Sequence, residues 1–176
     1  DLRVFSGRSS VGVRGIRLSE KDAVISLAIL NGINFNVNER DEYLKISSAQ
    51  RKNEQIDEIN LSKDKINEFK ANEEFLLSVT DKGFGKRSSA YEYRKSNRGG
   101  LGIANMQLGQ RNGNEIIASF PIKENDQLML VTNNGQLIRC PVNDVRIAGR
   151  QTQGVTLFNV SEKERVVSVA KLEENE

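Results

Sequence analysis

The sequence predicts an all-β fold built as a propeller-like array of repeated four-stranded blades. One segment occurs three times: it reads GVRGIRLSEKDAVISL at 12–27, GIANMQLGQRNGNEIIASF at 102–120 and GVTLFNVSEKERVVSV at 154–169. Each copy has a glycine, a β-prone strand, a polar turn and a second β-prone strand. Self-similarity of this kind indicates an array of similar sheets.

A second match gives the length of the repeat. FLLSVTDKGFGKR at 75–87 matches QLMLVTNNGQLIR at 127–139, and Gly102 matches Gly154, each at an offset of 52 residues. Four strands in about 50 residues is the size of a propeller blade. Gly12 and Gly102 are 90 residues apart, which is 38 more than the repeat length. The excess predicts an insertion between the first two copies.

These registers divide the chain into four parts. We expect the C-terminal part of a blade at 1–33, a helical or mobile insert at 34–73, a full blade at 74–122, and a last blade with a short acidic tail at 123–176. DLRVFSGR at 1–8 matches DVRIAGR at 144–150 with one residue inserted, so the array starts inside a repeat.

Turn residues place the four strands of the last blade. The expected strands are 127–132, 136–141, 154–160 and 165–172. Asn134-Gly135 predicts a two-residue type I′ hairpin turn, which needs positive φ at both central residues. Lys82-Gly83 occupies the same place one repeat earlier.

The insert has a different composition from the blades. It lacks glycine and proline and is rich in charged residues and asparagine. A helix is expected at 39–53. A second helix is expected after Ser62, because serine is a favoured N-cap and Leu61 and Ile66 stand at the positions of a hydrophobic staple. Two readings stay open: a surface excursion without a function of its own, or an element that docks a partner.

Composition excludes most enzyme classes. The chain has no histidine and one cysteine, Cys140. It therefore lacks the residues of a Ser-His-Asp triad or an ordinary zinc site, and it fits a reducing compartment. No apolar run reaches the roughly 18–20 residues of a membrane span. The GFGKRS sequence at 83–88 lacks the spacing of a phosphate loop and predicts a β-turn instead. We expect no catalytic residue, metal or cofactor in this chain.

Arginine and lysine recur at matched positions in the repeats. The net charge is only +2, but residues 75–111 carry +5 and residues 39–74 carry −3. Arginine binds phosphate oxygens in a bidentate manner, so basic sites that recur once per blade could hold a duplex along a curved rim without reading its bases. The alternative is that they are ordinary solvated charges on strands. The candidate residues are Lys86, Arg87, Arg94, Lys95, Arg98, Arg139, Arg146 and Arg150, with Arg8, Arg14 and Arg17 as a second group.

Four segments resemble the C-terminal domain of the A subunit of bacterial DNA gyrase. They are residues 12–30, 83–103, 110–122 and 126–158, which cover most of the chain outside the insert. The resemblance implies a six-bladed β-pinwheel, of which this chain would hold the later blades. It also implies that duplex DNA wraps on the basic outer rim, so that the parent enzyme can introduce negative supercoils.

The same resemblance implies the wider setting. The partners would be the rest of the gyrase A subunit and, through it, the gyrase B subunit, in the bacterial cytoplasm with the nucleoid and not at a membrane. ATP and magnesium would act in other parts of the parent. The family's QRRGGRG-type box is missing, and SNRGGLG at 96–102 is a degenerate echo of it. The cleavage core with its tyrosine is missing too, so cleavage is not assigned here. The alternatives are the matching domain of the topoisomerase IV A subunit and a propeller-like protein-interaction scaffold with the insert as docking arm.

Overall fold

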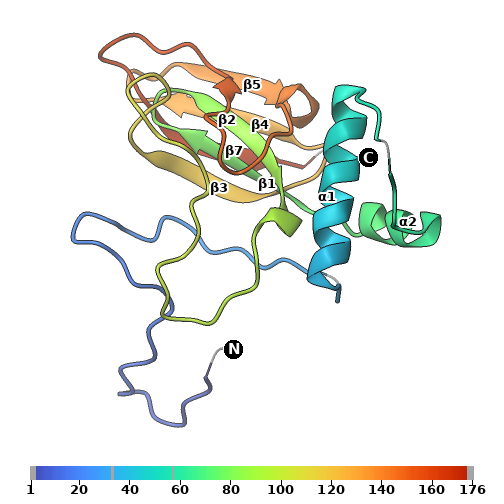
Figure 1. Ribbon diagram of the computed structural model, residues 1–176. Helices are drawn as coiled ribbons and strands as arrows, with labels where there is room; N and C mark the ends of the chain where they lie inside the picture. The colour runs from blue at the N-terminus through green and yellow to red at the C-terminus, as the bar shows by residue number, and fades with distance from the viewer. Residues whose placement is uncertain (1–2, 33, 57, 174–176) are drawn as a thin grey trace.

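Two antiparallel sheets form neighbouring blades, and two helices stand at one end of them (Figure 1). The computed structural model describes residues 3–32, 34–56 and 58–173. The first sheet has the strand order β3-β1-β2-β6 and the second has the order β5-β4-β7. The strands are β1 (Phe75–Thr80), β2 (Phe84–Ser89), β3 (Ile116–Ile122), β4 (Gln127–Thr132), β5 (Leu137–Pro141), β6 (Val155–Thr156) and β7 (Val166–Leu172). The expected mostly-β, blade-based fold is confirmed.

One short strand crosses from the last repeat into the sheet of the preceding repeat. β6 pairs antiparallel with β2 through Phe84↔Thr156 and Gly85↔Val155. Just beyond it, the amide of Leu157 donates to the carbonyl oxygen of Gly83 at 2.8 Å. The blade formed by β1, β2 and β3, which we call the first blade, is therefore completed by backbone from the last repeat. The pairing covers an edge of the sheet that would otherwise stay unpaired.

Glycine is required where this strand crosses. Gly83 has a φ of +73°, and a Cβ placed on it would lie 2.2 Å from the carbonyl oxygen of Phe158. Gly135 stands one repeat later with a φ of +80°, and there a Cβ would meet nothing within 4 Å. The two glycines share a backbone conformation, but only Gly83 lies under a crossing strand.

The predicted type I′ turn at Asn134-Gly135 is wrong. Among the described non-glycine residues only Asn53 has positive φ, so Asn134 does not meet the type I′ requirement. The amide of Gly135 donates to Thr132, and Gly83 donates to Thr80 in the same way. Both hairpins use a three-residue loop that ends on a left-handed glycine, the next commonest hairpin connection.

A shared apolar core lies between the two sheets. Along β4 the buried residues alternate with half-buried ones, as expected for a strand with one face on a core. Two 3₁₀ turns, η1 (Ala90–Glu92) and η2 (Val142–Asp144), follow β2 and β5. The buried core residues are Leu77, Val79, Ile122, Leu128, Leu130, Val142, Val145 and Val166.

The first copy of the repeat does not form its predicted strands. Residues 3–32 contain no strand, and Val11 and Leu27 are exposed. In the later copies the second strand pairs with the first strand of its own blade, β3 with β1 and β7 with β4. In the described residues before Gly12 there is no strand of that kind, so the first copy has no sheet to join.

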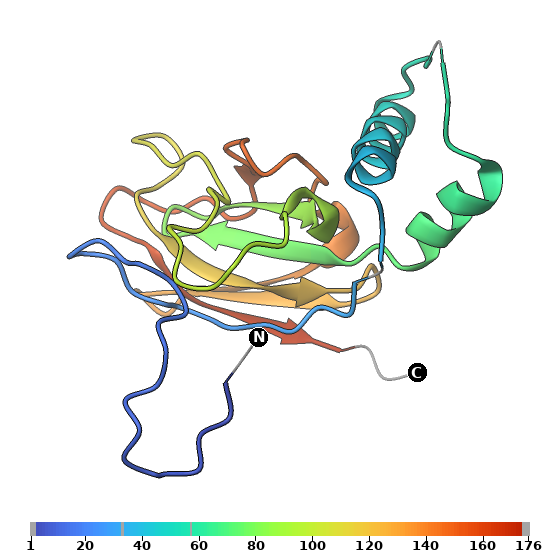
Figure 2. The ribbon, with the colours of Figure 1, turned by 60° about the horizontal axis from the view of Figure 1, so that its bottom comes forward.

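The insert is helical, as predicted. α1 (Val37–Lys52) begins with a capping box between Asn36 and Glu39, and α2 (Lys63–Ala71) begins at the predicted N-cap, Ser62. Figure 2 shows both helices beside the end of the sheets rather than over a sheet face. No helix in the described part of the chain is long and apolar enough to cross a membrane.

Aromatic side chains fasten the insert to the first blade. Tyr43 of α1 stacks on Phe69 of α2 with ring centroids 4.9 Å apart. Tyr91, from η1 of the blade, packs edge-on against both rings and donates its hydroxyl to the carbonyl oxygen of Phe69 at 3.0 Å. These contacts between Tyr43, Phe69 and Tyr91, which we call the aromatic seat, fix the insert on the first blade.

The two glycines give a matched test of strand crossing. Gly135→Ala should lower the free energy of unfolding by about 1–2 kcal/mol, the cost of a side chain in the left-handed region. Gly83→Ala adds a clash with the Phe158 carbonyl and should cost clearly more. Urea unfolding of both variants measures the difference. An equal loss at both positions would contradict the crossing.

The aromatic seat gives a second test. Phe69 is 1% exposed, so Phe69→Ala should lower the free energy of unfolding by about 3–5 kcal/mol. Ile59, in the same insert, is 50% exposed, and Ile59→Ala should change it by no more than about 0.5 kcal/mol. Thermal and urea unfolding monitored by circular dichroism compare the two. A negligible loss for Phe69→Ala would mean that the insert is not seated.

Candidate nucleic-acid interface

Two loops at matched positions carry the exposed basic side chains. Residues 93–100 follow η1, and residues 144–151 begin at the end of η2; we call these segments the rim loops. Arg94 and Arg146 are equivalent at the 52-residue offset, and both are exposed. The two blades therefore present the same kind of charge at the same point of the fold.

The first rim loop has the larger exposed group. Arg94, Lys95 and Arg98 are all exposed, and they are followed by Gly99 and Gly100. Arg146 in the second loop and Arg139 on β5 are exposed as well, although the Arg139 Nε donates to Gln127 at 3.0 Å. These side chains are accessible to a phosphate backbone.

The first copy docks on the first rim loop. The amide of Arg17 donates to the carbonyl oxygen of Gly100 at 2.8 Å, and the amide of Gly99 donates to Gly15 at 2.6 Å. The repeat equivalent of the first bond joins Gln107 to Thr152 at 3.3 Å. These two bonds place Arg14 and Arg17 beside the first rim loop, and both side chains are exposed. Arg8 is also exposed, earlier in the same segment.

Lys86 does not belong to the exposed set. Its side chain is fully buried, and its Nζ donates to the carbonyl oxygen of Gly149 at 2.7 Å. Burial lowers its pKa to about 8; Glu92 opposes this shift and Arg150 adds to it. The expectation that Lys86 contacts phosphate is therefore corrected, because this amine ties β2 to the second rim loop.

Arg87 is corrected for the same reason. It is 6% exposed, and its Nε donates to the carbonyl oxygen of Val145 at 2.6 Å. Its guanidinium also lies 3.6 Å from the carboxylate of Glu124. Loss of water on burial lowers its pKa, and Glu124 opposes that shift.

Arg150 has a mixed role. Its amide donates to Glu92 at 2.7 Å, and its guanidinium donates to the carbonyl oxygen of Ala104 at 2.9 Å. The side chain is half-buried and braces the second rim loop against the preceding repeat. The sequence pattern treats Arg98 and Arg150 alike, but exposure separates them.

The tyrosine hydroxyls are engaged inside the protein. Tyr43 donates to Glu73 at 2.9 Å, Tyr91 donates to Phe69, and Tyr93 is bonded to Asn105. Burial raises the pKa of all three, that of Tyr91 to about 12. Such phenols stay protonated near neutral pH and are poor nucleophiles.

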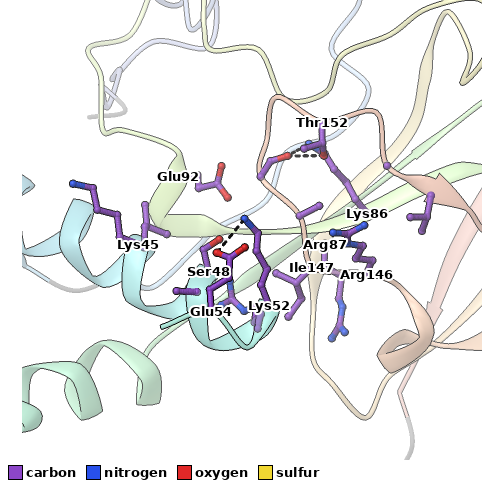
Figure 3. A pocket seen from close by; sticks show the side chains of 17 residues that line it. Lys45, Ser48, Lys52, Glu54, Lys86, Arg87, Glu92, Arg146, Ile147 and Thr152 are labelled. Atoms are coloured by element: carbon purple, nitrogen blue, oxygen red, sulfur yellow. Dashed lines mark hydrogen bonds and ion pairs between the residues drawn. The ribbon is translucent and has the colours of Figure 1, made fainter. Parts of the chain in front are cut away.

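Sequence reasoning missed a basic groove between the insert and the second rim loop. Figure 3 shows Lys45 and Lys52 on α1, with Arg146, Thr152 and Lys86 on the opposite side. Lys45 and Lys52 are seven residues apart and so share one face of a helix. That spacing is visible in the sequence, but the position of the helix beside the rim loop is not.

Comparisons with known proteins match this architecture. The family model "DNA gyrase C-terminal domain, beta-propeller" matches residues 1–31, 74–123 and 126–173. The DNA gyrase A subunit of Granulibacter bethesdensis is 46% identical over 194 residues, which covers 99% of this chain and 21% of that protein. The DNA gyrase A subunit of Rickettsia bellii is 47% identical over 182 residues, which covers 99% of this chain and 20% of that protein.

Two solved structures share the fold. A DNA gyrase A C-terminal domain has a TM-score of 0.53 and 22% identity, covering 56% of this chain and 33% of that one. The C-terminal domain of a DNA topoisomerase IV has a TM-score of 0.53 and 25% identity, covering 57% of this chain and 31% of that one.

The chain spans about a fifth of the length of the curated relatives it matches. The family matches leave out the insert, whereas these two relatives are aligned over nearly all of the chain and hence across the insert. The sequence repeat and the crossing strand β6 agree with these matches. The chain therefore belongs to the DNA gyrase C-terminal domain, beta-propeller family.

Proposed function

We propose that this chain binds duplex DNA through its phosphates, without reading sequence, and helps to wrap the duplex as part of a DNA gyrase A subunit. The observation that carries the proposal is the matched exposure of Arg94 and Arg146 on rim loops of adjacent blades. Charges at equivalent points of a curved array neutralise phosphates at intervals along a bent duplex. Arginine suits this role because its planar guanidinium matches phosphate geometry.

The proposed contact set is smaller than the sequence set. It contains the exposed basic residues of the two rim loops, Arg139 on β5 and three exposed arginines of the N-terminal segment. Lys86 and Arg87 are left out because their side chains are buried on backbone carbonyls. The set is Arg94, Lys95, Arg98, Arg139, Arg146, Arg8, Arg14 and Arg17, with Arg150 in a bracing role.

The wider role follows from the relatives. In the parent protein, wrapping by this domain would support ATP-dependent negative supercoiling, with strand cleavage, ATP and magnesium handled in other parts of the enzyme. Its protein partners would be the rest of the A subunit and, through it, the gyrase B subunit, at the bacterial nucleoid. We favour gyrase over topoisomerase IV because curated relatives near 46% identity are gyrase A subunits.

Filter binding of a duplex at several salt concentrations tests the proposal. For the unaltered chain, log affinity should fall steeply with log salt, by about 0.9 for each phosphate neutralised. Arg94→Glu with Lys95→Glu should weaken binding and reduce the slope by about 1.8, since two contacts are lost. A flat salt dependence of the unaltered chain would contradict the proposal.

The matched control reverses two charges elsewhere. Lys63 and Lys70 are exposed on α2, and neither belongs to a rim loop. Lys63→Glu with Lys70→Glu changes the net charge by the same amount and should have a much smaller effect on the slope. If both double variants lose affinity equally, net charge rather than the rim loops governs binding.

A further inference from the structure

We propose that the insert forms a second wall of the DNA path, with Lys45 and Lys52 of α1 binding phosphates across a groove from Arg146. This inference rests on the proposed function and extends it to a segment that the family matches leave out. The groove has a volume of about 870 Å³ and lies between α1 and the second rim loop.

The wall is held in place from both ends of α1. Asn53 ends the helix in the left-handed conformation, and the capping box at Asn36 starts it. Near its C-terminal end, Arg51 pairs with Glu73 at 3.1 Å and lies over the ring of Phe75 on β1. Together with the aromatic seat, these contacts fix which face of α1 lines the groove.

That face is basic even though the insert as a whole is acidic. Residues 39–74 carry a net charge of −3, and the acidic residues of α1 all lie in its first two turns, at Glu39, Asp41 and Glu42. The groove is lined by six basic and two acidic residues. Placement rather than composition therefore makes this surface positive.

Two of the six basic residues pair with carboxylates outside the groove lining, Arg51 with Glu73 and Arg87 with Glu124. Among the described residues, Lys45 and Arg146 form no ion pair. Glu92 accepts the amide of Arg150, and Glu54 lies 3.8 Å from Lys52. The Lys52–Glu54 pair is exposed on both sides, so it contributes little and can exchange for a phosphate. Lys45, Lys52 and Arg146 are therefore available to bind an anionic chain in the groove.

Continuity with the rim favours a phosphate backbone as the occupant over an acidic peptide. Arg146 is the repeat equivalent of Arg94 and belongs to the second rim loop. The buried Lys86 amine ties Gly149 of the same loop to β2, so the groove begins where that loop is anchored. A duplex that follows the rim loops meets α1 at this point.

The test compares salt-dependent DNA binding of the whole chain with that of Lys45→Ala plus Lys52→Ala. The inference predicts that the slope falls by about 1.8 and that affinity at 0.1 M salt falls by roughly tenfold. Lys45→Arg with Lys52→Arg should retain binding, because the charges stay. Circular dichroism and thermal unfolding confirm that each variant keeps its fold.

The control is Lys63→Ala with Lys70→Ala, which removes the same charge from α2. If the Lys45/Lys52 variant matches this control, the inference is overturned while the rim proposal stands, provided that the Arg94/Lys95 variant still loses affinity. If instead the Lys45/Lys52 variant keeps DNA affinity but loses binding to polyglutamate, the groove binds acidic protein and the inference fails.

Discussion

The pairing of the crossing strand β6 with β2 is the contact on which the rest of the structure depends. The two residues of β6 pair with β2, and the next amide bonds to Gly83. The contact needs backbone at a distance that excludes a side chain, so glycine stands at 83, 85 and 154, where a Cβ would lie within 3 Å of a neighbouring atom. Because the crossing fixes the two blades relative to each other, it also fixes the spacing of their rim loops. A change here would alter the spacing of charges that lie far from it.

Two buried cations of β2 then anchor the second rim loop on the blade that precedes it. Lys86 and Arg87 give up water and donate to the carbonyls of Gly149 and Val145. A buried charge is costly unless it is bonded in this way. The exposed Arg146 lies between the two anchored positions, so its backbone is held where the side chain can reach solvent. Basic residues thus have two roles in one loop: those inside hold it, and those outside remain available to an anionic ligand.

Sequence reasoning went far on the blades and less far on the site. The repeat and its turn residues predicted β4, β5 and β7 of the last blade, and Ser62 predicted the start of α2. The strand expected at 154–160 forms only at Val155–Thr156 and pairs with the preceding sheet. The sequence repeat could not show that Arg87 is buried and Arg94 is exposed, because it identifies equivalent positions and not their burial. The strands expected in the first copy are absent, since β propensity forms a sheet only where a partner strand exists. The prediction of a type I′ turn was wrong because Asn134-Gly135 also fits a three-residue loop that ends on glycine. The groove beside α1 depends on the packing of Tyr91 against Phe69, which no local pattern reveals.

Wrapping, as distinct from binding, is the central claim, and DNA topology measures it directly. A nicked circular duplex is closed with ligase in the presence of increasing amounts of the chain, and the topoisomers are then separated after the protein is removed. If the rim bends the duplex around the blades, the distribution should shift progressively from that of free DNA. A distribution that stays unchanged while the DNA is fully bound would contradict wrapping and leave a protein that only holds DNA.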